Sequence, residues 1–491
     1  MIDSDLYALD VEDPTALDRM LSDDFEDWSK QAASTGFCSR PVRLFGQART
    51  FDRRSGQHLQ TFDSRNLPDS VLYVRCGNRR ASRCPSCSHE YQGDMWHLLS
   101  AGVSGGDKGV PESVSAHPLV FLTLTAPSFG AVHSSTRPGA QPRPCTVHAA
   151  PGLCEHGRPR RCTAHHDADD SRVGQALCSD CYDYEGQAVW QWHCPELWRR
   201  FTIRLRRLVA ARLGMSEKAS RDLLRVQFAK VGEYQKRGAI HLHALVRLDG
   251  APTDEEPFPS PAIDVPASWL AERCLEAAQD VEVDAAPVDA NDDARALRFG
   301  RQVDARPVQR HAEDDIDVSP EMVAAYLAKY ATKAAGDVAT DGTTNRHLKY
   351  LRESCLELCG RALLSEGFSS PYALLGKWAD ALGFRGHFAS KSRRFSTTLG
   401  SLRDARHKYH RDREQFETSA APSGIADSAE DTEPTVVINE FRFAGQGWLT
   451  PGDAELARSA ADAARAWKDS RRAALRLHEK GKNHGKALLH R

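Results

Sequence analysis

The chain has 491 residues, of which 41% are hydrophobic and 27% are charged, and its formal net charge is −2. This composition is ordinary for a soluble globular protein with two to four domains or large insertions. No apolar run approaches the roughly 18 residues that a membrane-spanning helix needs. The acidic start MIDSDLYALDVEDP lacks the basic and apolar regions of a secretory signal, so we expect a cytoplasmic protein without a membrane partner.

Residues 1–115 form a polar N-terminal region, and the cysteines that begin there continue into an insertion at 137–194. Two cysteine pairs have the two-residue spacing that lets both thiolates bind one tetrahedral zinc ion, and in a cytoplasmic chain this spacing favours zinc over disulfides. We predict two structural zinc sites, the first formed by Cys38, Cys76, Cys84 and Cys87 and the second by Cys154, Cys162, Cys178 and Cys181. His156, His165 and His166 are alternative ligands of the second site.

The run PLVFLTLTAP at 118–127 predicts a central strand, because its apolar and polar side chains alternate. A helix from 195 to about 213 follows the insertion and has a stripe of arginines, among them Arg199, Arg200, Arg204, Arg206 and Arg207. On charge alone, this stripe is equally well explained as a solvated helix face.

The stretches 225–231 and 239–248 predict an antiparallel hairpin with Gly238 in its turn. An acidic, proline-rich segment at 250–317 has the composition of a surface loop. We expect a helix at 320–335 and, in residues 401–491, a linker and a basic C-terminal region.

Two histidines share one face of the second strand of this hairpin. In GAIHLHALVRL, His241 and His243 are two residues apart, so both imidazoles point to the same side. Glu233, across the turn, can reach that side, and two imidazoles with a carboxylate suit Mg²⁺ or Mn²⁺. The alternative is a pair of hydrogen-bonded histidines on a solvent-facing strand.

The helix at 320–335 places Tyr326 and Tyr330 on one face together with Lys329, opposite a small aliphatic face. A tyrosine hydroxyl can attack a phosphodiester when a metal ion polarises the phosphate and a cation offsets its charge. Histidines, carboxylate, tyrosines and lysine together predict DNA strand cleavage and joining.

The order FLTLT, HLH and YLAKY resembles the three motifs of the HUH endonuclease superfamily. Within that superfamily, the chain resembles rolling-circle replication initiators of actinobacterial plasmids and integrative conjugative elements. This resemblance extends over most of residues 36–410, through stretches such as CPSCSHEYQGD, PELWRRF, EYQKRGAIHLH and KSRRFSTTLG.

The resemblance implies an α+β fold with a central antiparallel sheet flanked by helices, a ferredoxin-like or palm-like core, in a nicking domain at 116–400. It implies that His241 and His243 bind the catalytic metal and that Tyr326 and Tyr330 are the paired nucleophiles. Some similar initiators have glutamate at the position of Tyr326, which leaves open whether both tyrosines attack DNA.

The implied function is nicking and rejoining of one strand at a replication origin through a 5′-phosphotyrosine. The implied DNA target is a single-stranded or hairpin nick site, and the arginine stripe becomes a candidate for contacts with the DNA backbone. Because the chain has no GxxxxGK[ST] motif, a host helicase and a single-strand-binding protein are the expected partners. An HUH-type transposase and a non-enzymatic, zinc-containing DNA-binding regulator are the alternatives.

Overall fold

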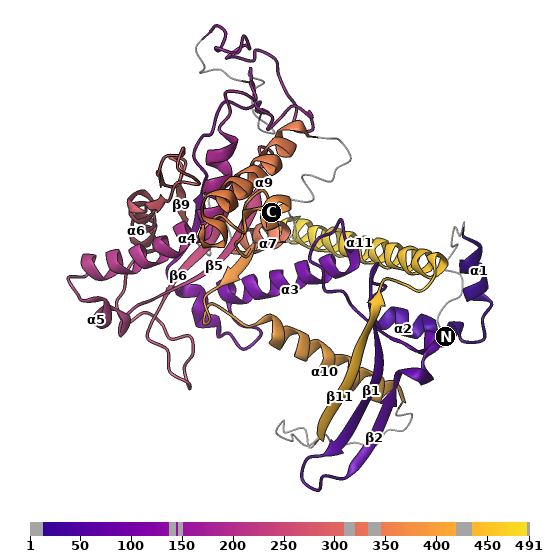
Figure 1. The fold of residues 1–491 in the computed structure, drawn as a ribbon. Helices are drawn as coiled ribbons and strands as arrows, with labels where there is room; N and C mark the ends of the chain where they lie inside the picture. Colours follow the sequence, from indigo (N-terminus) through magenta and orange to yellow (C-terminus); the bar gives the residue numbers. More distant parts are fainter. Residues whose placement is uncertain are drawn as a thin grey trace. The chain divides into compact units, whose positions relative to one another are not determined.

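The computed structural model describes residues 13–136, 144–145, 151–308, 320–331, 345–418 and 435–488. The chain divides into two compact units, the terminal unit (Met1–Tyr91 with Phe416–Arg491) and the central unit (Gln92–Gln415). Both contain helices and antiparallel strands (Figure 1), so the predicted α+β class with antiparallel sheets and flanking helices is confirmed. No helix in the described part of the chain has the length and apolarity needed to cross a membrane.

A five-stranded antiparallel sheet, in the order β10-β5-β6-β4-β9, forms the middle of the central unit. Its strands are β4 (Leu119–Leu124), β5 (Arg225–Tyr234), β6 (Ile240–Asp249), β9 (Asp304–Pro307) and β10 (Ala389–Lys391). β5 and β6 form the predicted hairpin, and Gly238 in its turn has a φ of 70°, which glycine adopts without strain. The strand with both histidines therefore has a neighbouring strand on each side.

One face of this sheet packs against helices and forms the main core. Alternate residues of β6 lie in that core, namely Ile240, Leu242, Ala244, Val246 and Leu248. The helices α4 (Tyr184–Arg212), α6 (Ala267–Asp280) and α9 (Arg346–Glu366) add Phe201, Leu270 and Leu351 to it. Burial of an apolar side chain of this size contributes about 1.5–3 kcal/mol. The apolar alternation therefore keeps the histidines of β6 on the other face.

The central unit contains further elements besides this sheet and these helices. They are α3 (Pro85–Ser104), which begins in the terminal unit, α5 (Glu217–Arg221), α7 (Pro320–Ala331), α10 (Leu399–Thr418) and the strand pair β7 (Val283–Ala285) and β8 (Arg295–Leu297). Short 3-10 helices span Glu112–Ala116, Gly367–Ser369 and Leu375–Ala381. α7 begins at the predicted residue, and the predicted continuation to 335 lies outside the described residues.

The terminal unit is built on a second antiparallel sheet, in which β1 (Val42–Asp52) pairs with β2 (His58–Asp63), β3 (Leu72–Val74) and β11 (Thr435–Gln446). Its helices are α1 (Pro14–Met20), α2 (Phe25–Ser34) and α11 (Pro451–Leu488), and 3-10 helices span Ser64–Asn66 and Pro68–Ser70. The ring of Trp448 lies 5.4 Å from that of Trp28 and 4.7 Å from that of Tyr73. These three aromatic side chains join the two ends of the chain in one small core.

The division of the chain differs from the predicted regions 1–115, 116–400 and 401–491. β11 pairs with β1 along its whole length, from Val42 opposite Gln446 to Asp52 opposite Thr435. The N-terminal and C-terminal segments therefore form one unit. Sequence reasoning missed this because strand pairing between distant segments leaves no local pattern.

The expectation of a surface loop at 250–317 is wrong for much of that segment. It contains α6, β7, β8 and β9, and β9 is an edge strand of the central sheet. Leu270, Cys274 and Ala277 of α6 are fully buried at the spacing of a helix face. The arginine helix also begins earlier than predicted, at Tyr184, where the Asp183 side chain accepts a hydrogen bond from the Gly186 amide.

Candidate active site

The face of the central sheet opposite the main core brings together the residues predicted for catalysis. Glu233 on β5 is the register partner of His241 on β6, and Thr123 on β4 is the partner of His243. Directly opposed residues of an antiparallel pair point to the same side. The hairpin and β4 thus place one carboxylate, one hydroxyl and two imidazoles on a single patch of the sheet.

His243 is in the middle of this patch and is almost fully buried. Its Nε2 lies 3.3 Å from Oε2 of Glu233, and its Nδ1 lies 3.1 Å from Oγ1 of Thr123. Its ring stacks on that of Phe121, with 5.7 Å between the centroids. These contacts on three sides fix the orientation of the imidazole.

Helix α7 contributes Tyr326 to the same patch. The Tyr326 hydroxyl lies 3.4 Å from Nε2 of His243, and its ring meets the rings of His243 and Phe121 edge-on. The residue is 39% exposed, so Tyr326 combines contact with the site and access from outside. Tyr326 therefore lies directly beside the candidate metal ligand His243.

The two faces of α7 follow the predicted division. The buried side chains are Val323, Ala324, Leu327 and Ala328, whereas the exposed ones include Met322, Tyr326 and Lys329. Tyr330 belongs to the helix, but its side chain lies outside the described part of the structure.

His241 has an environment that suits a metal ligand. Its Nε2 is buried and has no hydrogen-bond partner among the described residues, and its ring lies 4.9 Å from that of His243. Burial, followed by electrostatic repulsion from the neighbouring His243 and Arg237 side chains, lowers the pKa of His241 to about 3. The imidazole is therefore neutral at pH 7, which is the form that binds a metal ion.

A buried nitrogen without a partner, next to an imidazole and a carboxylate, fits a divalent cation. Three other groups of the described residues bring all their ligand atoms within 4.8 Å of one another, and these groups consist of cysteine and histidine. His241, His243 and Glu233 do not form a fourth such group, so their ligand atoms are more widely spread.

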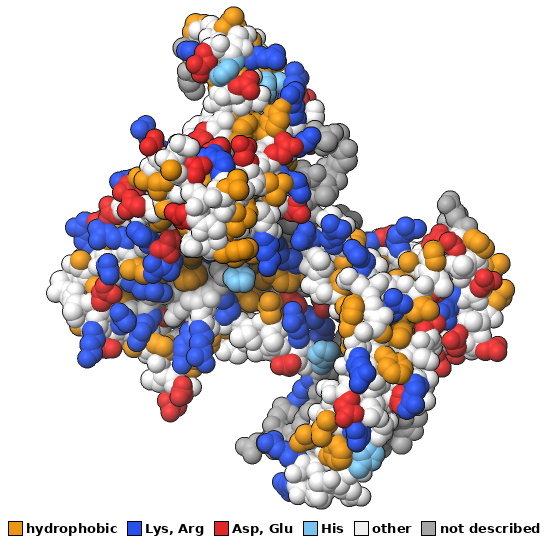
Figure 2. All heavy atoms as spheres, in the orientation of Figure 1, with side chains coloured by type: hydrophobic (Ala, Val, Ile, Leu, Met, Phe, Trp, Pro, Cys, Tyr) orange, Lys and Arg blue, Asp and Glu red, His pale blue; other side chains and the backbone are white. Residues whose placement is uncertain are grey.

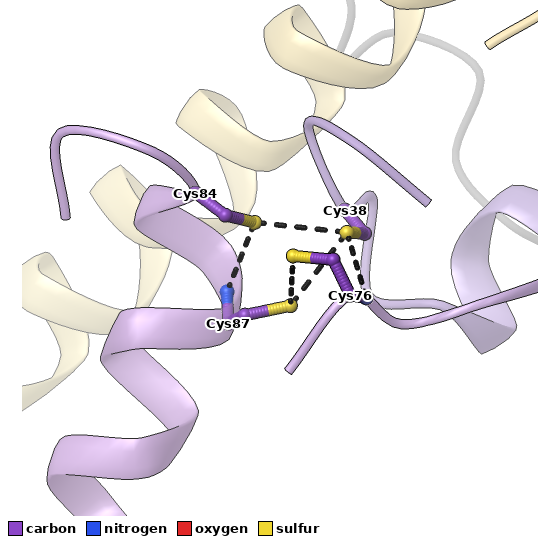
Figure 3. Close-up of side chains that lie close together, drawn as sticks. All are labelled: Cys38, Cys76, Cys84 and Cys87. Atoms are coloured by element: carbon purple, nitrogen blue, oxygen red, sulfur yellow. Dashed lines mark hydrogen bonds between the residues drawn. The ribbon is translucent and has the colours of Figure 1, made fainter. Parts of the chain in front are cut away.

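The first of these groups, the four-cysteine group, consists of Cys38, Cys76, Cys84 and Cys87 (Figure 3), the residues predicted for the first zinc site. The Sγ of Cys38 lies 3.6 Å from those of Cys84 and Cys87. The backbone amides of Cys76 and Cys87 donate hydrogen bonds to the sulfurs of Cys38 and Cys84, both over 3.4 Å. Tetrahedral zinc places neighbouring thiolates about 3.8 Å apart, so the group has suitable dimensions.

The predicted second site is divided between two groups. The three-cysteine group consists of Cys154, His156, Cys178 and Cys181, and the two-histidine group consists of His133, Cys145, Cys162 and His166. Assignment of Cys162 to the same site as Cys154 is wrong, and the described residues contain three groups that can hold a metal ion instead of two. His156 and His166, considered as alternative ligands, each lie in one group, whereas His165 lies in neither.

Comparison with known proteins agrees with a role in DNA replication. The model of the family RepSA, described as "Replication initiator protein, pSAM2", matches residues 24–462. A replication initiator protein of Streptomyces ambofaciens is 39% identical over 483 residues, which cover 94% of this chain and 96% of that relative. The chain belongs to the RepSA family of replication initiator proteins. No solved structure matches it.

The arginine stripe of this RepSA-family initiator has less free positive charge than its sequence suggests. Figure 2 shows Lys and Arg side chains mixed with carboxylates over the region of α4 and α5. Arg199 and Arg200 both pair with Glu196, at 2.7 and 3.0 Å, and Arg204 pairs with Asp280 at 2.7 Å. Arg207 pairs with Glu217 at 3.0 Å. Contacts of Arg199, Arg200, Arg204, Arg206 and Arg207 with DNA stay a prediction.

Sequence reasoning missed several residues that shape the site of this RepSA-family chain. Thr123 and Phe121 were assigned only to a strand, although the FLTLT motif was the signal that could have identified them. Arg237, in the hairpin turn, donates hydrogen bonds to the carbonyls of Pro127 and Ala126, at 3.0 and 3.2 Å. It thereby ties the turn to the segment that follows β4, and no sequence pattern points to this role.

Proposed function

We propose that this initiator nicks and rejoins one DNA strand at an origin through a covalent 5′-phosphotyrosine and so starts rolling-circle replication of a plasmid or integrative element. Membership of the replication initiator family supports the biological role. The observation that carries the chemistry is the Tyr326 hydroxyl, which lies 3.4 Å from a histidine that is 3.3 Å from Glu233. The proposal places the chain in the HUH endonuclease superfamily that its motifs resemble.

In the first step, the phenolic oxygen of Tyr326 attacks the phosphorus of a phosphodiester. A bond forms between that oxygen and phosphorus, the bond from phosphorus to the 3′ oxygen breaks, and the 3′ oxygen takes up a proton. The phenol loses its proton, and the 5′ phosphate stays attached to the protein. Attack by a 3′-hydroxyl reverses these changes, rejoins the strand and releases the tyrosine.

His241, His243 and Glu233 would hold a divalent cation, Mg²⁺ or Mn²⁺, beside this tyrosine. When bound, the cation would polarise the scissile phosphate. The chain's own residues orient the site, because Thr123 and Phe121 hold the ring of His243. Lys329, on the exposed side of α7, would offset charge on the phosphate, and Tyr330 would be the second nucleophile of a paired mechanism.

The four-cysteine and three-cysteine groups would hold structural zinc. Each fills four positions with protein ligands and leaves no position for substrate, which is typical of zinc that stabilises a fold. A host helicase would supply unwinding, and a single-strand-binding protein would protect the displaced strand.

The test is to incubate supercoiled origin DNA with the full-length protein and Mg²⁺ or Mn²⁺, and to identify the covalent adduct by mass spectrometry. We expect a 5′-phosphotyrosyl peptide that contains Tyr326 or Tyr330, and no adduct with Tyr326→Phe/Tyr330→Phe. The matched control is Tyr409→Phe, because Tyr409 is 63% exposed on α10 and outside the proposed site. Nicking without any tyrosyl adduct, or full nicking by the double variant, would refute the mechanism.

A further inference from the structure

The two-histidine group has the dimensions of a tetrahedral zinc site. Nδ1 of His133 lies 3.1 Å from Nε2 of His166, and the sulfur of Cys145 lies 3.7 Å from the same His133 atom. The sulfur of Cys162 lies 3.4 Å from Nε2 of His166. Bonds of about 2.3 Å to sulfur and about 2.0–2.1 Å to nitrogen place zinc ligands about 3.3–3.8 Å apart. The observed separations are close to this range.

The surroundings of the group orient its ligands for a metal ion. Nδ1 of His166 lies 2.7 Å from a carboxylate oxygen of Asp170, which leaves Nε2 to face the other three ligands. A carboxylate behind a ligating histidine is the usual second partner in zinc sites. The Ser134 amide donates a hydrogen bond to the Cys145 sulfur over 3.2 Å, which favours the thiolate. Two nitrogens and two sulfurs, without an oxygen ligand, select zinc over Mg²⁺ or Ca²⁺.

The segment 168–175 connects this group to the turn of the β5–β6 hairpin. Gly174 lies against the backbone of Lys236, so closely that a Cβ at Gly174 would be 2.4 Å from the Lys236 carbonyl carbon. The Lys236 ammonium donates a hydrogen bond to the carbonyl of Ala168. Lys236 thus contacts one residue on each side of Asp170, Ala168 before it and Gly174 after it.

The C-terminal end of the segment, at Gly174 and Gln175, is held by the backbone of His133, another member of the two-histidine group. The Gly174 amide donates to the carbonyl of His133 over 2.8 Å, and the His133 amide donates to the carbonyl of Gln175 over 2.9 Å. The segment that contacts the hairpin therefore lies between His133 and the His166–Asp170 pair. Its conformation depends on both halves of the two-histidine group.

We propose that His133, Cys145, Cys162 and His166 bind a third zinc ion, and that the segment fixed by this ion presses on Lys236 and holds the hairpin turn at 235–239. The turn joins the strand ends on which Glu233 and His241 lie. A zinc ion outside the proposed active site thereby sets the spacing of residues within it. This inference goes beyond the nicking reaction, and its test does not use that activity.

The first measurement is the zinc content of the purified full-length protein by mass spectrometry of the metal. We expect three zinc ions per chain in the native protein and two in Cys145→Ser and in Cys162→Ser. These two ligands lie on different segments, so one variant still tests the site if the other does not fold. A native content of two, or an unchanged content in either folded variant, would overturn the assignment.

The second measurement is hydrogen exchange of the hairpin turn, where the Gln235 amide donates to Ala239 and the Gly238 amide donates to Gln235. We expect exchange at these amides to be at least about tenfold faster in Cys145→Ser. The matched control, Cys181→Ser in the three-cysteine group, should lose one zinc ion without this change. Gly174→Ala should keep three zinc ions and still loosen the turn. A variant that loses the third ion and keeps native exchange at the turn would refute the connection.

Discussion

The strand that carries both histidines is anchored at its far end by a buried ion pair, and breaking this pair should be costly. Arg247 and Asp249 have side chains that are 0% and 2% exposed, and they are joined by hydrogen bonds of 2.6 and 2.7 Å. Asp249 also lies 2.8 Å from Nδ1 of His117. Asp249→Asn keeps the shape of the side chain but leaves the guanidinium without its countercharge. We expect a loss of about 3–5 kcal/mol in the free energy of unfolding.

Urea denaturation followed by tryptophan fluorescence can measure this loss, because Trp190, Trp192 and Trp198 of α4 are buried in the same unit. The matched control is Asp280→Asn, which breaks the exposed pair with Arg204 and should cost less than about 1 kcal/mol. Arg247→Met combined with Asp249→Asn removes the unpaired charge and should recover at least about 2 kcal/mol. If Asp249→Asn costs no more than the control, the strand does not depend on this pair.

Three further predictions concern metal binding and pH. Glu233→Gln should weaken Mn²⁺ binding at the proposed active site at least about tenfold in a titration with the full-length protein, and unchanged affinity would remove Glu233 from the ligands. Cys84→Ser should lose one zinc ion per chain and make the terminal unit sensitive to trypsin, whereas a full zinc content would contradict the four-cysteine site. Burial and then the charge of Arg385 lower the pKa of His193 to about 4. Only the unfolded chain therefore binds this proton between about pH 6.5 and 4, and stability falls as pH is lowered through that window. In His193→Gln, the free energy of unfolding, measured by thermal unfolding, should fall less steeply with decreasing pH, by up to about 1.4 kcal/mol per pH unit. A pH dependence identical to that of the native protein would contradict the assignment.

The fold was predictable where the signal was local. The alternation in AIHLHALVRL predicted a strand with the histidines on one face and Ile240, Leu242 and Ala244 on the other, and these three residues are indeed in the core. The pairing of β1 with β11 was not predictable, because the two strands are almost 400 residues apart. Most residues of β11 are exposed and nearly all of β1 are only half-buried, so neither strand has a buried apolar face that would reveal its partner. In the acidic segment, composition hid α6, whose buried face rests on small residues and one leucine instead of a strongly apolar stripe.

The candidate metal sites could likewise be predicted only where their ligands are close together in the sequence. A spacing of two residues between Cys84 and Cys87 lets both thiolates bind one ion, because the start of a helix brings them together. This half of the four-cysteine site could therefore be predicted from the sequence. The ligands His133 and Cys145 are not part of any such pair, and Cys162 lies nearer in sequence to Cys154 than to either. Only the fold, which brings His133 beside Gln175 and Cys145 beside Ala164, assigns Cys162 to its group. The same folding places Gly174 against Lys236, so the feature that was hardest to predict is also the one that connects a zinc group to the histidine hairpin.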